Sequence, residues 1–214
     1  SYLTANSDGT STVNPHNDQR LVGSSSASSS SSFTGIDNRS FNLTSSVNLG
    51  QGALRVTNVG TGGASTPASA SVTSSIAEYL DTFTIVGNFS SPILVPFTAT
   101  FDGNWAQTNT DFVSLSGQVW FGTSATVEDW SNPSGNPGQD LYDQDALFKS
   151  FANDFDGAVE LSITGNLSLS GLNPSFVAWL RMEAAVFSRN PQATWNGDFA
   201  NTGKLEFDFT GLTV

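Results

Sequence analysis

Eight carboxylates lie within 33 residues of this chain, and Lys149 is the only base among them. Loops that combine carboxylate, amide and backbone oxygens suit Ca²⁺, which takes about six to eight oxygen ligands. We expect no obligatory cofactor, and this stretch makes calcium the one candidate; a solvated acidic face is the alternative. The eight acids are Glu128, Asp129, Asp140, Asp143, Asp145, Asp154, Asp156 and Glu160. The predicted calcium ligands are Asp140, Asp143, Asp145, Asp154 and Asp156.

Three tryptophans stand beside Asn, Asp and Gly, the residues typical of loops: Trp105, Trp130 and Trp195. An exposed indole next to amides and carboxylates is suited to sugars, because the ring stacks on C–H groups while the polar groups bind hydroxyls. These residues predict a carbohydrate-binding site. The alternative is that they plug the corners of a β-sandwich, and Trp120 and Trp179, within apolar runs, are predicted core residues.

The patterns of nucleophiles and acids favour no catalytic site. The chain has no cysteine and a single histidine, His16, in a polar N-terminal stretch. Glu160, Glu206 and Asp208 alternate with apolar residues, so their carboxylates belong to the solvent side of strands. A glycosidase with two such acids is the enzymatic alternative, but we predict that the protein is not an enzyme.

Alternation of apolar and polar residues predicts an all-β fold. Asp-Gly, Asn-Gly, Asn-Pro and Thr-Gly pairs between the runs predict turns. Together they indicate one antiparallel β-sandwich, jelly-roll-like, over residues 33–214. A short helix is expected over 143–151, where Leu147, Phe148 and Phe151 share a helical face behind Asp143. The predicted strands cover 41–44, 46–49, 54–59, 82–86, 93–101, 112–121, 159–164, 176–187 and 205–210.

Residues 1–32 are predicted to form a flexible N-terminal arm. Eight of the nine residues from Ser24 to Ser32 are serine, and such a tract has no side chains to bury, which is typical of a linker. The arm before it holds two short apolar pieces. Tyr2, Leu3, Leu21 and Val22 are the residues that would fill pockets if the arm joined a neighbouring subunit's sheet as a strand. A disordered terminus is the alternative.

The composition is unusual in its scarcity of charge. Charged residues make up 12 % of the chain, and 19 acids against 7 bases give a net charge of −12 and a pI of about 4.1. Such a chain repels phosphate backbones and anionic lipids, and it has no apolar run of spanning length. We therefore expect no nucleic acid partner and no membrane insertion. The absence of cysteine excludes disulfides, and with the neutral polar surface it favours a bacterial exported protein.

Two stretches carry a family resemblance. Residues 66–87 join a run of small residues to Asp-Thr-Phe-Thr, and residues 197–209 contain Asp-Phe-Ala-Asn-Thr. Both resemble segments of bacterial exported proteins that carry a C-terminal PEP-CTERM sorting signal, although the Pro-Glu-Pro motif, apolar helix and basic tail of that family are absent from this chain. The resemblance implies a cell-surface or matrix β-protein among exopolysaccharides, and it supplies no catalytic residue.

These observations predict a non-catalytic structural protein at the cell surface or in the extracellular matrix. We expect its partner to be itself, in filaments built through the arm and the edge strands, and polysaccharide is a further candidate partner. The alternative is a lectin-like carbohydrate-binding module, with or without a requirement for calcium.

Overall fold

The computed structural model of the protein describes residues 2–6, 16–18, 26–34, 39–62, 71–123, 140–152 and 154–210. Within these ranges the one helical element is the 3-10 turn η1 (Leu49–Gln51), and everything else that is regular is strand. The strands are β1 (Tyr2–Asn6), β2 (His16–Asp18), β3 (Ser26–Thr34), β4 (Ser40–Asn48), β5 (Ala53–Thr61), β6 (Ser71–Thr84), β7 (Asn88–Thr108), β8 (Phe112–Gly122), β9 (Asp140–Phe151), β10 (Phe155–Leu172), β11 (Ser175–Ser188) and β12 (Thr194–Phe207).

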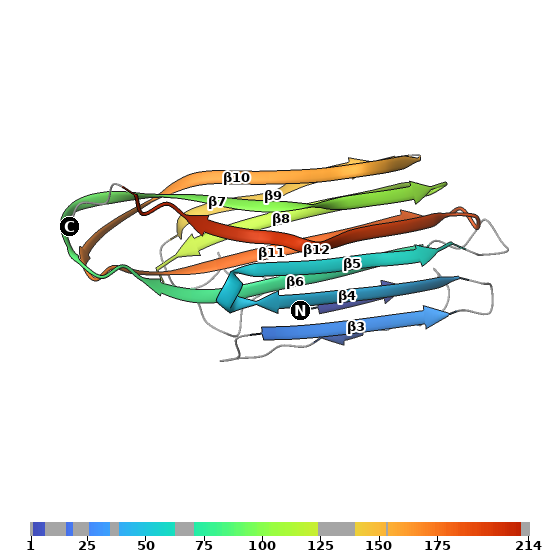
Figure 1. Ribbon diagram of the computed structural model, residues 1–214, viewed down its shortest axis with the longest axis horizontal. Coiled ribbons are helices and arrows are strands. Elements are labelled where there is room, and N and C mark those ends of the chain that lie inside the picture. The colour runs from blue at the N-terminus through green and yellow to red at the C-terminus, as the bar shows by residue number, and fades with distance from the viewer. Residues whose placement is uncertain are drawn as a thin grey trace.

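The strands form two six-stranded sheets that pack face to face (Figure 1). Sheet A has the order β2-β1-β6-β11-β8-β9, and sheet B has the order β10-β7-β12-β5-β4-β3. Neighbouring strands are antiparallel in both sheets. The prediction of an antiparallel β-sandwich is therefore confirmed.

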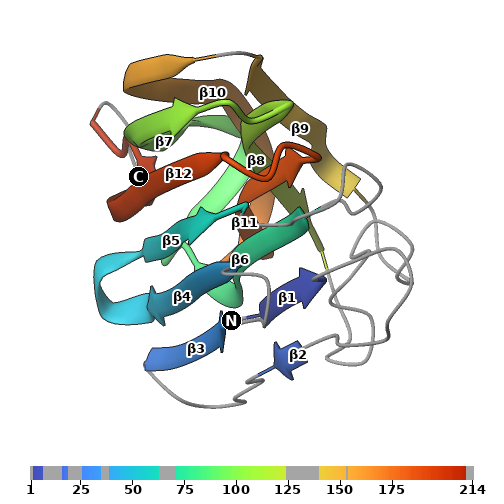
Figure 2. The ribbon, with the colours of Figure 1, turned by 90° about the vertical axis from the view of Figure 1, so that its right-hand side faces the viewer.

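From β5 onward the chain passes repeatedly from one sheet to the other. At one end of the sandwich β6 connects to β7 and β10 connects to β11, at the left of Figure 1. The opposite end, which faces the viewer in Figure 2, carries the connections between β7 and β8, β9 and β10, and β11 and β12. Both β9 and β10 lie at one side of the sandwich, and β2 and β3 lie at the other.

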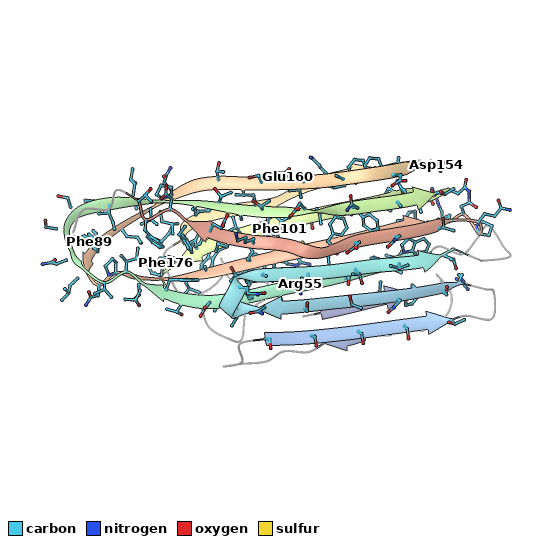
Figure 3. All side chains as sticks on the ribbon, viewed as in Figure 1. Arg55, Phe89, Phe101, Asp154, Glu160 and Phe176 are labelled. Carbon is cyan, nitrogen blue, oxygen red and sulfur yellow. The ribbon has the colours of Figure 1, made fainter. Side chains whose placement is uncertain are left out.

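The core lies between the sheets, and period-two alternation supplies it. Leu43 on β4 and Val56 on β5 are completely buried, as are Leu115 on β8 and Leu180 on β11. An aromatic group continues the core toward the end where Figure 3 labels Phe176, and its members are Phe97, Phe121, Phe176 and Phe207 with ring centroids 4.6–6.0 Å apart between contacting pairs. Burying side chains of this size is the main stabilisation of such a fold.

Four of the glycines predicted to mark turns lie inside strands instead: Gly103, Gly157, Gly197 and Gly203. Gly103 is on β7 and Gly197 is on β12, and Gly197 pairs with Trp105. A Cβ on Gly197 would meet the Trp105 ring at 2.4 Å, and a Cβ on Gly60 would meet the Trp195 ring at 2.5 Å. Gly197 and Gly60 each leave the space that an indole on the next strand occupies.

The helix predicted over 143–151 is wrong, because these residues belong to strand β9. β9 pairs with β8 from Phe151 opposite Val113 to Asp140 opposite Gly122, with two register shifts on the way. This long ladder outweighs the weak helical periodicity of a nine-residue window.

The Ser-rich tract, predicted to be a linker, is strand from Ser26 onward. β3 pairs with β4 from Ser26 opposite Asn48 to Thr34 opposite Ser40, so the predicted boundary between residues 32 and 33 falls inside a strand. The serine side chains of β3 bury little apolar surface. β3 can still pair with β4 through its backbone, because Phe41, Leu43 and Val47 of β4 supply the buried apolar side chains. Residues 2–6 and 16–18 of the predicted arm also form strands.

Candidate functional site

The open edges of the two sheets are the strongest candidate site for association. Edge strands are β2 and β9 in sheet A and β3 and β10 in sheet B. At the edge of a sheet, a strand of another chain can join the side of the edge strand that has no neighbouring strand. With 18 residues β10 is the longest of the four, and the side chains along its whole length are described.

Two hydrogen bonds show which residues of β10 face the open side. Asp208 donates its N–H to the carbonyl of Pro96 at 2.9 Å, so Pro96 on β7 faces β12, and its partner Asn166 on β10 faces away from β7. Independently, Lys149 Nζ donates to the carbonyl of Glu160 at 2.6 Å from the β9 side. Because the backbone direction alternates along an antiparallel strand, Ser162, Thr164 and Ser168 also present N–H and C=O to the open side.

The open side of β10 carries charge only at its start. Asp156 and Glu160 are the charged residues of this strand, and Lys149 caps Glu160 from the neighbouring sheet. From Leu161 to Leu172 no residue is charged, and Ser162, Thr164, Asn166, Ser168 and Ser170 are exposed. Natural edges are usually protected by Lys, Pro or a covering segment. This signal was present in the sequence, which has no charge between Glu160 and Arg181.

At the other side of sheet B, β3 is an edge strand made almost entirely of serine. Its outward face, with Ser26, Ser28, Ser30 and Ser32, is exposed, whereas Ser29 is buried. Sheet B therefore ends in the uncharged strand β3 at one side and, at the other, in β10, which is uncharged from Leu161 onward.

The predicted assembly residues divide between described and undescribed parts of the chain. Tyr2 and Leu3 lie on β1, where Tyr2 pairs with Asp18 and Ile76, and Leu3 pairs with Asn17 and Ser75. The strand thus joins its own chain's sheet A, between β2 and β6. Leu21 and Val22 lie outside the described residues.

The carbohydrate-binding prediction is wrong for Trp105 and Trp195. Trp105 packs edge-on against Phe199 within the core, and Trp195 donates Nε1–H to Asn58 Oδ1 at 3.0 Å. Both side chains are buried, so neither offers a ring face to a sugar. Trp130 lies outside the described residues.

The two tryptophans predicted to be core residues are buried on the outer side of sheet A and not between the sheets. Trp120 and Trp179 pair directly across β8 and β11 and form a second apolar cluster with Val177, separate from the main core. Near the opposite end of the same strands Phe112 and Phe187 stack with centroids 5.5 Å apart. Trp120 and Trp179 are buried, whereas Phe112 is partly exposed.

The predicted calcium ligands cannot surround one cation. Asp143 pairs with Trp120, whereas Asp154 accepts the N–H of Asn109 at 2.8 Å, beyond the end of β8 where Val113 pairs with Phe151. Trp120 and Val113 are seven residues apart on β8, or roughly 23 Å at ~3.3 Å per residue. Asp140, Asp143 and Asp145 share β9, but their side chains lie outside the described set. Asp154 and Asp156 are exposed, and no metal-ligand cluster of three acids or histidines occurs in the described ranges.

Two carboxylates, the half-buried Asp111 and the exposed Asp208, have a lowered pKa. The side-chain hydrogen bond from Arg189 is the main cause that lowers the pKa of Asp111, and the Arg189 Nη2 atom lies 2.9 Å from Asp111 Oδ1. The hydroxyl and then the backbone N–H of Thr210 lower the pKa of Asp208. Both effects hold the carboxylate ionised, which is the opposite of what a general acid at neutral pH needs.

No helix in the described ranges has the length and apolar character needed to cross a bilayer. No protein-family model, no curated protein and no solved structure matches this chain.

Proposed function

We propose that the protein is a non-catalytic structural component of a bacterial surface or extracellular matrix and that it associates with copies of itself through its sheet edges. The observation that carries this proposal is the open edge of β10, which is uncharged over its last twelve residues, Leu161 to Leu172. The scarcity of charge across the chain and the resemblance to PEP-CTERM proteins support the exported location.

Two copies can pair their β10 strands antiparallel about a twofold axis. The free groups of Ser162, Thr164, Asn166 and Ser168 then exchange main-chain hydrogen bonds, and the two B sheets become one. A twofold contact alone closes at a dimer. Growth into a filament needs the second edge of sheet B, β3, or exchange of β1 between neighbours.

Proline substitution on β10 tests the contact. At Ser162 and Thr164 the N–H points to the open side, so proline removes a donor for the partner and none for β7. We expect Ser162→Pro and Thr164→Pro to remain monomeric in analytical ultracentrifugation at concentrations where the parent chain forms larger species. Ser162→Ala keeps the N–H and should associate like the parent. A monomeric parent chain at high concentration, with no filaments in negative stain, contradicts the proposal.

Exchange of β1 is tested separately. Removing residues 1–32 would also remove most of β3, so the sharper variant lacks only residues 1–18, which hold β1 and β2. If β1 is exchanged, this variant should stop at dimers, whereas unchanged filaments would assign growth to β3.

Carbohydrate binding is the second candidate function. Its candidate site is now the outer face of sheet B and no longer the three tryptophans. The register places Ser32, Asn42, Val59 and Asn196 side by side across four strands, and the three polar members are exposed. Rows of hydroxyls and amides suit neutral sugars. Asn42→Ala with Asn196→Ala should lower retardation in polysaccharide affinity electrophoresis, whereas Ser162→Ala should not. Chelation should lower it as well if calcium takes part.

A further inference from the structure

One end of the sandwich carries four exposed apolar side chains, which we call the apolar end: Val86, Leu94, Leu172 and Phe209. Their exposed fractions are 80 %, 61 %, 73 % and 50 %. Three other large apolar side chains, Val59, Val72 and Phe112, are exposed by about 40 %, and their pairing with Asn196 or Phe187 places them toward the opposite end of the sandwich. The β6–β7 and β10–β11 turns of this end lie at the left of Figure 1, and Figure 3 labels Phe89 there.

Hydrogen bonds hold the two turns of this end together. Gly87 donates its N–H to Asn173 Oδ1 at 2.9 Å, and Asn173 returns its N–H to the Gly87 carbonyl at 2.7 Å. Ile85 donates to the Pro174 carbonyl at 3.0 Å, and Asn88 pairs with Leu172. The register that joins these turns places Val86 and Leu172 on the same side of the pair. Their exposure is therefore built into the fold.

The two turns of the apolar end carry no charge. Both segments that form its turns are uncharged over twenty residues, 82–101 and 161–180, although the chain as a whole has a net charge of −12. Asp208 is the one charged residue beside Phe209. These two turns can therefore approach a neutral apolar medium without desolvating a cation or a carboxylate of their own.

The size of the apolar end indicates what it contacts. Four side chains expose a few hundred Å² at most, which is below the ~800 Å² per partner of a stable protein interface. The same side chains at the tip of the sandwich can enter the boundary between lipid headgroups and acyl chains. Binding there depends on how deeply apolar side chains insert and does not need a large contact area.

We propose that the apolar end docks on a zwitterionic lipid surface and inserts Val86, Leu94, Leu172 and Phe209 to headgroup depth. No segment spans the bilayer in this arrangement. The proposal changes the earlier expectation of no membrane insertion only in that these side chains enter the headgroup layer. The serines beside them, Ser90, Ser91, Ser168 and Ser170, provide hydroxyls for headgroup oxygens. The net charge of −12 should oppose anionic lipids.

Flotation with phosphatidylcholine vesicles tests the proposal. Val86→Asp with Leu172→Asp should lower the bound fraction at least tenfold, because a large apolar side chain contributes about that much to partitioning and a charge opposes it. Val59→Asp with Val72→Asp, the same kind of change at two exposed valines of the sheet faces, should bind like the parent chain. Equal binding of both variants, or none by the parent, overturns the proposal.

The lack of cysteine permits a site-specific probe. A polarity-sensitive dye on Leu172→Cys should shift to shorter wavelength with phosphatidylcholine vesicles, and a dye on Val72→Cys should not. Replacing a third of the lipid by phosphatidylserine should weaken the response at low salt. If the dye emission shifts as the protein concentration rises without vesicles, the apolar end contacts a second copy of the chain, and the lipid proposal is overturned. Repeating the dye measurements in the Ser162→Pro background separates lipid binding from association through β10.

Discussion

At the scale of single residues, one amide connects the two sheets. Asn58 on β5 is fully buried, and its Nδ2 donates to the carbonyls of Thr73 and Ala184 on sheet A at 3.3 and 3.1 Å. Its Oδ1 accepts from Thr73 Oγ1 and Trp195 Nε1, both at 3.0 Å. All four hydrogen-bonding positions of the amide are therefore used, which fixes how the sheets sit on each other.

We expect Asn58→Leu to lower the free energy of unfolding by about 2–4 kcal/mol, because it leaves two buried donors and two carbonyls without this partner. Urea denaturation measures the loss. Asn42→Ala, at an exposed position of the neighbouring strand, should change it by less than about 0.5 kcal/mol. A similar loss for both variants would show that the network has no special role.

The Asp111–Arg189 pair gives a pH dependence. Arg189 holds the pKa of Asp111 below its ordinary value in the folded state, so this stabilisation is present above the unfolded pKa of about 4 and is lost as the pH falls through the folded pKa. Asp111→Asn should therefore show a smaller fall in melting temperature between pH 5 and pH 3 than the parent. Asp156→Asn, an exposed carboxylate without a described hydrogen bond, should fall like the parent.

Residue types predicted the core residues, but they did not predict that glycines make room for aromatic rings on neighbouring strands. Alternation placed Val159, Leu161 and Ile163 correctly, because a period of two fixes the buried face of a strand. Gly103 and Gly197 carried the signature of turns, and only the facing strand shows that Gly197 makes room for Trp105. That information belongs to a neighbour about ninety residues away and is not visible locally.

At the scale of elements, the predicted strands exist, but β1, β2, β3 and β9 were missed. β3 has no apolar pattern and forms because β4 provides a ladder, and β9 has a pattern that fits a helix over a short window. The open edge of β10 was visible as an uncharged alternating run, whereas its place at the border of sheet B required the topology. An edge depends on the absence of a neighbour, which no local pattern encodes.

Lys149 should regulate the edge of β10. Its ammonium group donates a hydrogen bond to the carbonyl of Glu160 on the open side of β10. A partner strand would otherwise use this carbonyl as an acceptor. We expect Lys149→Met to extend the available edge by one position and to raise the association constant severalfold in sedimentation equilibrium. Lys204→Met, which removes an exposed lysine bound to Glu206 on β12, should not do so. Weaker association of Lys149→Met would contradict this role.

At the scale of the whole molecule, charge opposes assembly and the edges favour it. Each copy carries −12, so two copies repel at long range, and salt screens this repulsion over about 10 Å at 0.1 M. We expect the weight-average mass of the parent chain to rise between 20 and 300 mM NaCl. Ser162→Pro should show no such rise. A mass that falls with salt would mean that ion pairs, and not backbone pairing, hold the copies together.

The position of β12 between β7 and β5 has a mechanical consequence. Hydrogen bonds run across the strands, so a pull along the last strand loads two ladders at once in shear. β1 is held by five residue pairs to β6 and by three to the short strand β2, and it should yield first. A matrix built from such units would resist tension through sheet B while the N-terminal strands act as its extensible part.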